Sequence, residues 1–285
     1  MQIREYSLPQ GWFPHDPSEV SRVISGYFKE TPPSSNPVSS ACIAPHAGWY
    51  YCGRLMALSL AALKKDAQTV AVIGGHLSID YPALFAMEDA VRTPFGSLPI
   101  DKELRAALIK EFDVLQDGSA EDKYRDNTIE VLLPMVHFFF PKANLLWLRL
   151  PASLEAYKAG KLLSKTANKL GKKIAVVGST DLTHYGRNYG FLPQGSGEKA
   201  LRWVREVNDA AFIKAVGGNP EEVLFRAEQD SSSCSAGAVL GAMGFASTEG
   251  LGGARLLEYA TSADLDRGVN VLPDSFVGYA AMALG

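Results

Sequence analysis

Short apolar runs and amphipathic stretches alternate along most of this chain. Residues 41–44 are continuously apolar, residues 54–65 have the spacing of a helix, and residues 69–76 begin with another apolar, β-branched run. A strand, a helix and a second strand in this order form a βαβ unit, in which the strands are parallel and the helix covers them. The pattern therefore predicts an α/β protein.

The same alternation continues to the C-terminus. Further strands are predicted at 83–86, 145–150, 174–178, 254–259 and 277–283. Further helices are predicted at 18–28, 101–112, 154–170, 200–215 and 235–243. Stretches rich in glycine or proline at 31–37, 195–197 and 249–253 are expected to be loops. We expect a single domain, residues 1–285, built on an extended central sheet.

Composition and charge exclude several classes of partner. With 28 basic and 31 acidic residues the formal net charge is −3, so no broad basic field for nucleic acid is expected. The N-terminus has no apolar signal-peptide core, and the most apolar stretch, 131–140, is short and interrupted by Pro134 and His137. We therefore expect a cytoplasmic protein with no membrane partner. Its three cysteines are too few for a disulfide framework and are expected to be free thiols.

Three of the five histidines follow predicted strands. His46 lies after the strand 41–44, His76 after the strand that begins at 69, and His184 shortly after the strand 174–178. Ligand sites of open α/β sheets lie at the carboxyl ends of the strands, so these residues can converge. Two neutral imidazoles and one anionic ligand are typical of a catalytic Fe(II) or Zn(II) site with open coordination positions. Asp181, Glu130 or Cys234 could supply the anion.

Structural roles compete with each of these interpretations. Asp181 could cap the turn or helix that follows it, and spacing alone makes Cys234 a small buried thiol packed against a helix. His137 and His15 are interpreted as structural residues of an apolar element and of the N-terminal turn. The sequence has no phosphate-binding loop, dinucleotide fingerprint or nucleophile elbow, which disfavours nucleotide use and serine hydrolysis.

Several sequence blocks resemble one family, the MEMO-like proteins, known in bacteria and archaea as AmmeMemoRadiSam system protein B. The blocks are 11–17 (GWFPHDP), 44–53 (APHAGWYYCG), 74–76 (GGH), 179–185 (STDLTHY), Cys234, 257–262 (LEYATS) and 275–281 (SFVGYAA). The resemblance runs almost end to end. It implies the fold of class III extradiol ring-cleaving dioxygenases: a central mixed, largely parallel β-sheet, helices on both faces, and a metal site at one end.

The resemblance also implies roles for individual residues. His46, His76 and Cys234 would be the metal ligands, since family members carry a cysteine where the dioxygenases have a glutamate. Asp181 would be an accessory ligand or orienting carboxylate, and His184 a general acid or base. Tyr51 would line the same cavity. The implied metal is divalent, with Fe(II) favoured and zinc or copper as alternatives.

Two positions depart from the family pattern. The usual sequence Glu-His-Ser-x-Glu is replaced at 126–130 by DNTIE, so Asn127 stands where an imidazole is expected. An amide donates and accepts hydrogen bonds but does not shuttle protons near neutral pH. Gly75 replaces a serine in the more usual Pro-Ser-His, which predicts a more flexible approach to His76.

Three functional hypotheses follow. The first is a metal-dependent, dioxygenase-like enzyme acting on a small, phenolic or similar substrate. The second is a subunit that uses no oxygen and works beside an AMMECR-type protein and a radical-SAM enzyme, as the bacterial family name implies. The third is a catalytically inactive binding module that keeps the pocket.

Overall fold

Four parallel strands form the centre of the protein in a computed structural model, which describes residues 1–29, 39–114, 118–250, 253–265 and 274–285. In spatial order they are β2 (Ala41–Ala44), β9 (Ile174–Ser179), β3 (Thr69–Gly74) and β8 (Asn144–Arg149). All four are almost entirely buried, as expected of parallel strands covered on both faces. The predicted loop 31–37 and residues 251–252 of the predicted loop 249–253 lie outside the described residues.

Antiparallel strands extend this centre on both sides. Within the described residues the main sheet has nine strands, in the order β10-β12-β2-β9-β3-β8-β4-β7, with β11 also paired to β12. The added strands are β4 (Ala83–Phe85), β7 (Ser119–Glu121), β10 (His184–Gly186), β11 (Ala254–Thr261) and β12 (Ser275–Leu284). A separate small sheet contains β1 (Ile3–Arg4), β5 (Ala90–Thr93) and β6 (Gly96–Pro99).

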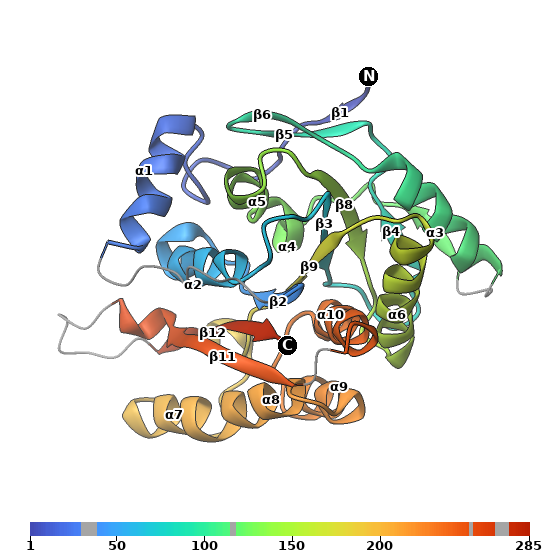
Figure 1. The fold of residues 1–285 in the computed structure, drawn as a ribbon. Coiled ribbons are helices and arrows are strands. Elements are labelled where there is room, and N and C mark those ends of the chain that lie inside the picture. The colour runs from blue at the N-terminus through green and yellow to red at the C-terminus, as the bar shows by residue number, and fades with distance from the viewer. Residues whose placement is uncertain (30–38, 115–117, 251–252, 266–273) are drawn as a thin grey trace.

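Helices cover both faces of the main sheet (Figure 1). Successive residues of β3 alternate between the faces: Val70 and Val72 belong to one apolar core, Ala71 and Ile73 to the other. The first core is covered by α1 (Pro17–Tyr27), α2 (Trp49–Ala61) and α5 (Leu133–Phe139). The second is covered by α3 (Lys102–Val114), α6 (Leu154–Lys169), α8 (Asp209–Val216), α9 (Pro220–Gln229) and α10 (Ala236–Thr248). No helix among the described residues is long and apolar enough to cross a membrane.

The predicted class, an α/β protein with a mixed sheet between helices, is confirmed, but several details differ. The parallel pairing is concentrated in the four central strands, and the strands added to them are mostly antiparallel. β9 lies between β2 and β3, so the predicted βαβ unit does not pair its own strands. Helix α2 begins at Trp49 rather than at residue 54, because the buried side chains of Trp49 and Cys52 already face the core.

Other differences concern short elements. The predicted helix 200–215 is divided into α7 (Glu198–Trp203), a π-helical turn (Val204–Asn208) and α8. The sequence pattern missed the hairpin β5–β6, strands β7 and β10, and helices α4 (Asn127–Glu130), α5 and α9. All of these except α9 are short, and α9 begins at Pro220. Two of these missed elements, α4 and β10, carry residues of the site described below.

Helices α6 and α10 pack in very close contact, and glycines make this possible. A Cβ atom at Gly160 would lie only 1.9 Å from the carbonyl oxygen of Gly241. The two backbones therefore touch where a side chain would separate them. This contact fixes α10 against the sheet, and the start of α10 in turn fixes the position of Cys234.

We predict that Gly160→Ala lowers the free energy of unfolding by about 2 kcal/mol or more, since the added methyl group meets backbone atoms that cannot move aside. The matched control is Gly26→Ala, on the exposed side of α1, where a Cβ meets nothing within 4 Å. This control should be neutral or stabilising by up to about 1 kcal/mol through helix propensity. Urea unfolding measures both, and equal effects would contradict the close packing.

Candidate metal centre

Three loops meet at the carboxyl edge of the central strands. His46 follows β2, His76 follows β3, and Asp181 follows β9, which lies between them. Because the three strands are parallel, their carboxyl ends lie side by side. Cys234 comes from a distant part of the sequence and stands two residues before the first residue of α10. Strand order and the packing of α10 thus bring four predicted site residues to one place.

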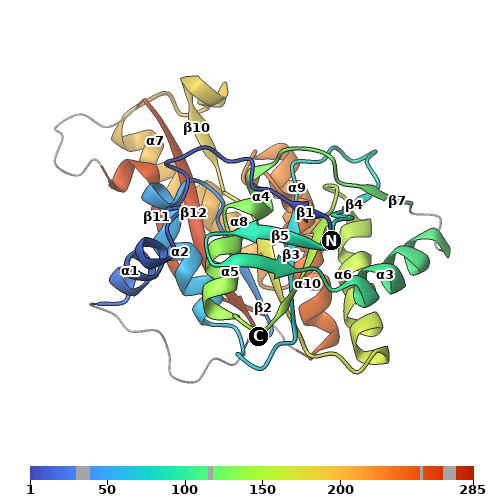
Figure 2. The ribbon, with the colours of Figure 1, turned by 90° about the horizontal axis from the view of Figure 1, so that it is seen from above.

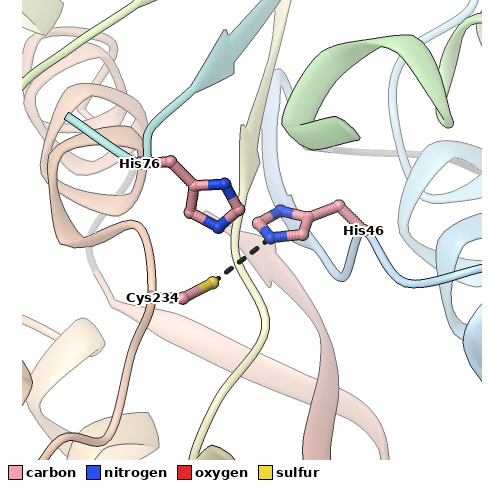
Figure 3. Close-up of side chains that lie close together, drawn as sticks. All are labelled: His46, His76 and Cys234. Atoms are coloured by element: carbon pink, nitrogen blue, oxygen red, sulfur yellow. Dashed lines mark hydrogen bonds between the residues drawn. The ribbon is translucent and has the colours of Figure 1, made fainter. Parts of the chain in front are cut away.

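His46, His76 and Cys234 offer three ligand atoms that all lie within 4.8 Å of one another. His46 Nε2 is 3.2 Å from Cys234 Sγ, and the two imidazole rings are nearly perpendicular, with centroids 5.0 Å apart. Figure 3 shows the three side chains pointing toward a common centre from separate elements. The arrangement can hold a metal ion.

The ring nitrogen of His46 that does not approach Cys234 has its own hydrogen-bond partner. Nδ1 lies 2.9 Å from the Ser179 hydroxyl, at the end of β9, and the imidazole is buried. The backbone N–H of His46 donates to Asp181 Oδ1 at 2.7 Å. Nε2 is thereby directed toward Cys234, which is the arrangement that orients a metal-binding histidine.

His76 is oriented in a similar way by a carboxylate. Its Nδ1 lies 3.0 Å from Asp126 Oδ2, and Asp126 also forms an ion pair with the buried Arg149 at 3.3 Å. His76 has a φ of +56°, a left-handed conformation that costs a non-glycine residue about 1 kcal/mol or more. In this conformation the imidazole lies against that of His46, and Asp126 holds it there.

Cys234 is placed in surroundings that favour its thiolate. Burial alone would raise its pKa, but His46, His184 and His76 around the sulfur hold the pKa well below the ordinary value of a thiol. The start of α10 adds the positive end of a helix dipole two residues away. A Cβ at Gly75 would lie 2.5 Å from the Cβ of Ser235, so the Cys234 loop packs directly against the end of β3. Gly75 therefore permits a close approach, whereas the sequence predicted flexibility there.

Asp181 and His184 lie beside this triad. The carboxylate of Asp181 is buried, with Oδ2 4.0 Å from His46 Nε2 and 3.9 Å from His184 Nε2. Burial raises the pKa of Asp181, which the nearby histidines only partly offset. The pKa of His184 is also raised: burial would lower it, but Cys234 and Asp181 outweigh burial. The interpretation of Asp181 as a cap is wrong, because its carboxylate accepts from His46 and strand β10 follows.

The remaining candidates lie elsewhere or farther from the triad. Glu130 is buried but accepts hydrogen bonds from Ser7 and Leu8 of the N-terminal segment, so it is not the anionic partner. His137 is bonded to Thr93, and His15 packs against Tyr6 and Phe13. Tyr51 is 49% exposed on the first turn of α2. Its ring lies edge-on to that of Tyr50, with centroids 5.2 Å apart.

Asn127 has a definite structural role. Its side-chain amide donates to the backbone carbonyl of His46 at 2.9 Å. Its predecessor Asp126 caps α4 and binds His76, so one short helix supports both histidines. Sequence reasoning missed Asp126, Ser179 and Arg149 as supporting residues. The signal that the sequence offered was Asp126 itself, since aspartate is a favoured N-cap residue.

The donor set fits a transition metal. Bonds of about 2.0–2.1 Å to nitrogen and about 2.3 Å to sulfur place the ligand atoms of a tetrahedral site roughly 3.3–3.8 Å apart, and small side-chain shifts bring the triad to these values. The pKa values of His46 and His76 are both raised, because the thiolate of Cys234 and nearby carboxylates attract positive charge. A metal cation can take the place of the protons on these two imidazoles.

Asp209 anchors the loop that carries Asp181 and His184. Its Oδ1 accepts from the backbone N–H of Thr183 at 3.1 Å and from the Thr183 hydroxyl, and its Oδ2 accepts from Tyr259 at 2.7 Å. The carboxylate is fully buried, and a Cβ at Gly278 of β12 would lie 2.0 Å from it. Burial raises its pKa to about 6, against the effect of these hydrogen bonds and of His184.

The fold and the site together define an α/β protein with a candidate His/His/Cys metal centre at the carboxyl edge of its sheet. The family model described as Memo-like protein matches residues 4–283, and the chain belongs to this family. The resemblance stated from the sequence blocks is thus confirmed.

Curated relatives agree with this assignment. A MEMO1 family protein of Pyrococcus horikoshii is 26% identical over 99% of both chains. A MEMO1 family protein of Desulfurococcus amylolyticus is 27% identical over 95% of both chains. Among solved structures, an uncharacterized protein from Escherichia coli K12 has a similar fold, with a TM-score of 0.53 at 12% identity, over 85% of this chain and 98% of that chain.

We predict that ionisation of Asp209 makes the protein less stable as pH rises. Because its pKa is about 6 in the folded state and near 3.8 when unfolded, the folded state binds the extra proton between these values. The associated stability is present below pH 4 and is lost as pH rises through 6. Asp209→Asn should remove this loss, so that between pH 4 and 7 the variant gains about 2–3 kcal/mol relative to wild type. Parallel urea-unfolding profiles across this range would contradict the prediction.

Proposed function

We propose that this Memo-like protein is a metal-dependent enzyme with a site of the extradiol-dioxygenase type, acting on a small phenolic substrate. One observation carries the proposal: three ligand atoms converge from separate elements, and the second nitrogen of each imidazole is held by another residue. Structural zinc sites usually close with four protein ligands, whereas three leave a coordination position open. An open position beside Asp181 and His184 is suited to catalysis.

The metal would be held by His46 Nε2, His76 Nε2 and Cys234 Sγ. Two imidazoles and a thiolate suit iron, zinc and copper, and the likeness of the family to dioxygenases favours Fe(II). The bound metal would supply Lewis acidity toward a substrate oxygen and, as iron, a path for electrons. The protein supplies the fixed geometry of the donors and the buried carboxylate of Asp181 beside them.

His184 and Asp181 are proposed to manage the proton of the substrate. A phenolic hydroxyl held at the site would be within reach of His184, whose Nε2 is buried and has no hydrogen-bond partner among the described residues. His184 Nε2 would accept this proton and later return it, and Asp181 would stabilise the imidazolium 3.9 Å away. Tyr51 is proposed to line the approach to the site from α2.

A second candidate function is favoured by the role of Asn127. Its amide is bound to the His46 carbonyl, so this position offers no proton shuttle to a substrate. A thiolate is also oxidised more easily than a carboxylate. Under this candidate the site performs Lewis-acid chemistry without oxygen, as a subunit beside AMMECR-type and radical-SAM partners in the cytoplasm.

We predict that the protein, loaded anaerobically with Fe(II), Zn(II) or Cu(I), binds about one metal ion per chain. His46→Ala and Cys234→Ala should each lose most of it, because two remaining donors bind weakly. The matched control is His137→Ala, which removes a histidine bonded only to the β5–β6 hairpin. Elemental analysis after gel filtration measures the metal content. Equal content in wild type and in both site variants would contradict the ligand assignment.

We predict that the Fe(II)-loaded protein consumes dioxygen with catechol-type substrates. His184→Gln should lower the rate by about 10²-fold or more, since general acid–base catalysis is worth 10²–10⁴-fold, while leaving the metal content unchanged. An oxygen electrode with a panel of catechols measures the rate. No uptake by a fully metal-loaded protein would reject oxygen chemistry in favour of the second candidate. Equal rates in wild type and variant would contradict the role of His184.

A further inference from the structure

A second concavity lies between the N-terminal segment, one side of α1 and the first turn of α2. Helices α1 and α2 are neighbours in both views (Figures 1 and 2). Its volume is about 650 Å³, larger than the other main hollows of the described surface. We call it the aromatic hollow because six of its lining side chains carry aromatic rings: Trp12, Phe13, His15, Tyr27, Trp49 and Tyr50. None of the residues proposed to bind metal lines it.

The aromatic hollow is a built feature of the fold. The backbone N–H of Trp49 donates to the carbonyl of Trp12 at 2.8 Å, which fastens the N-terminal segment to the start of α2. The indole N–H of Trp49 donates to the carbonyl of Val131 at 2.9 Å, and the Tyr27 hydroxyl to the carbonyl of Trp49 at 3.3 Å. These polar groups are thus occupied by the protein itself. What the rings can offer a ligand is mainly their π faces.

The charged groups of the aromatic hollow have one sign. Asp16 and Glu19 line it, and no lysine or arginine is found among its described lining residues. His15 also lines it, and its buried Nε2 has no hydrogen-bond partner among the described residues. Asp16 caps α1 through Oδ1, which accepts from Ser18 and from the backbone N–H of Glu19, while Oδ2 receives no hydrogen bond from the described residues. Those hydrogen bonds lower the pKa of Asp16, so it is anionic at neutral pH. Among the described residues, Glu19 forms an ion pair with the exposed Arg22, at 3.7 Å.

We propose that the aromatic hollow binds a guanidinium group. Aromatic faces attract a cation within about 6 Å of the ring centroid, and carboxylates provide the compensating charge. A guanidinium is planar and weakly hydrated, so it stacks on indole rings and bonds to carboxylate oxygens at once, which an ammonium group does less well. Trp12 and Tyr50 would stack on the group, and Asp16 Oδ2 and Glu19 would accept its N–H groups.

The site is independent of the metal centre but close to it in the chain. Tyr50 stands four residues after His46 and directly before Tyr51, which is proposed above to line the approach to the metal centre. A ligand bound through a guanidinium in the aromatic hollow would therefore contact the first turn of α2. This binding goes beyond the proposed function and does not require a bound metal.

The probe is N-acetyl-arginine amide, and the matched neutral probe is N-acetyl-citrulline amide, which replaces the guanidinium by a urea of nearly the same shape. Two of the four tryptophans line the aromatic hollow, so intrinsic fluorescence reports binding. We expect saturable binding of the arginine probe in the millimolar range, at least about tenfold weaker binding of the citrulline probe, and weakening by salt.

The double variant Asp16→Asn, Glu19→Gln should bind the arginine probe at least about tenfold more weakly, because it removes both charges. Asparagine caps a helix about as well as aspartate, so α1 should remain folded, as thermal unfolding would verify. The control is Glu198→Gln in the first turn of α7, which should leave binding unchanged. The proposal is overturned by equal binding of both probes, by undiminished binding to the folded double variant, or by no saturable response to the arginine probe.

Discussion

The buried guanidinium of Arg149 holds together the parts on which the site depends. It donates two hydrogen bonds to the carbonyl of Gly75, at 3.0 and 2.8 Å, and forms ion pairs with Asp122 and Asp126 at 3.3 Å. Removing one partner of such a buried charge group is costly, typically about 3–5 kcal/mol, since the remaining charge is left without compensation. The end of β3 is therefore fixed relative to α4, and His76 is fixed with it.

Helix α4 and its N-cap residue connect this buried charge cluster to the rest of the site. Asp126 orients His76, Asn127 bonds to the backbone of His46, and Glu130 binds the N-terminal segment at Ser7. One short helix thereby links both candidate ligands with the segment that forms the aromatic hollow. The thiolate of Cys234 and the carboxylates around it give the centre a surplus of negative charge, which raises the pKa values of His46 and His76 against the effect of burial.

The convergence of His46, His76 and Asp181 could be predicted from the sequence because each follows a buried strand and parallel strands end at one edge. The order of the strands could not, since nothing in the chain between β2 and β3 indicates that β9 lies between them. Spacing alone favoured a packing role for Cys234, and the family resemblance was needed to favour it as a ligand. Its contact with His46 joins residues 188 positions apart and depends on the packing of α10.

Supporting residues were the hardest to predict. Residues such as Asp126, Ser179 and Arg149 are common at helix N-caps, at strand ends and in ion pairs of any protein. Here they support the site because of the particular residues that they contact. Asp209 is similar: a carboxylate at the start of a helix is common, but this one is buried behind the loop of Asp181 and His184. In each case the role arises from a contact between distant segments, which local pattern does not encode.

The central claim is that His46, His76 and Cys234 bind one metal ion and leave a coordination position open. X-ray absorption spectroscopy of the anaerobically loaded protein tests it most directly, because sulfur and nitrogen ligands differ in distance. The account predicts one sulfur at about 2.3 Å, two imidazole nitrogens at about 2.0–2.1 Å and an exchangeable light ligand. A spectrum without sulfur, or with four protein ligands and no exchangeable position, would contradict it.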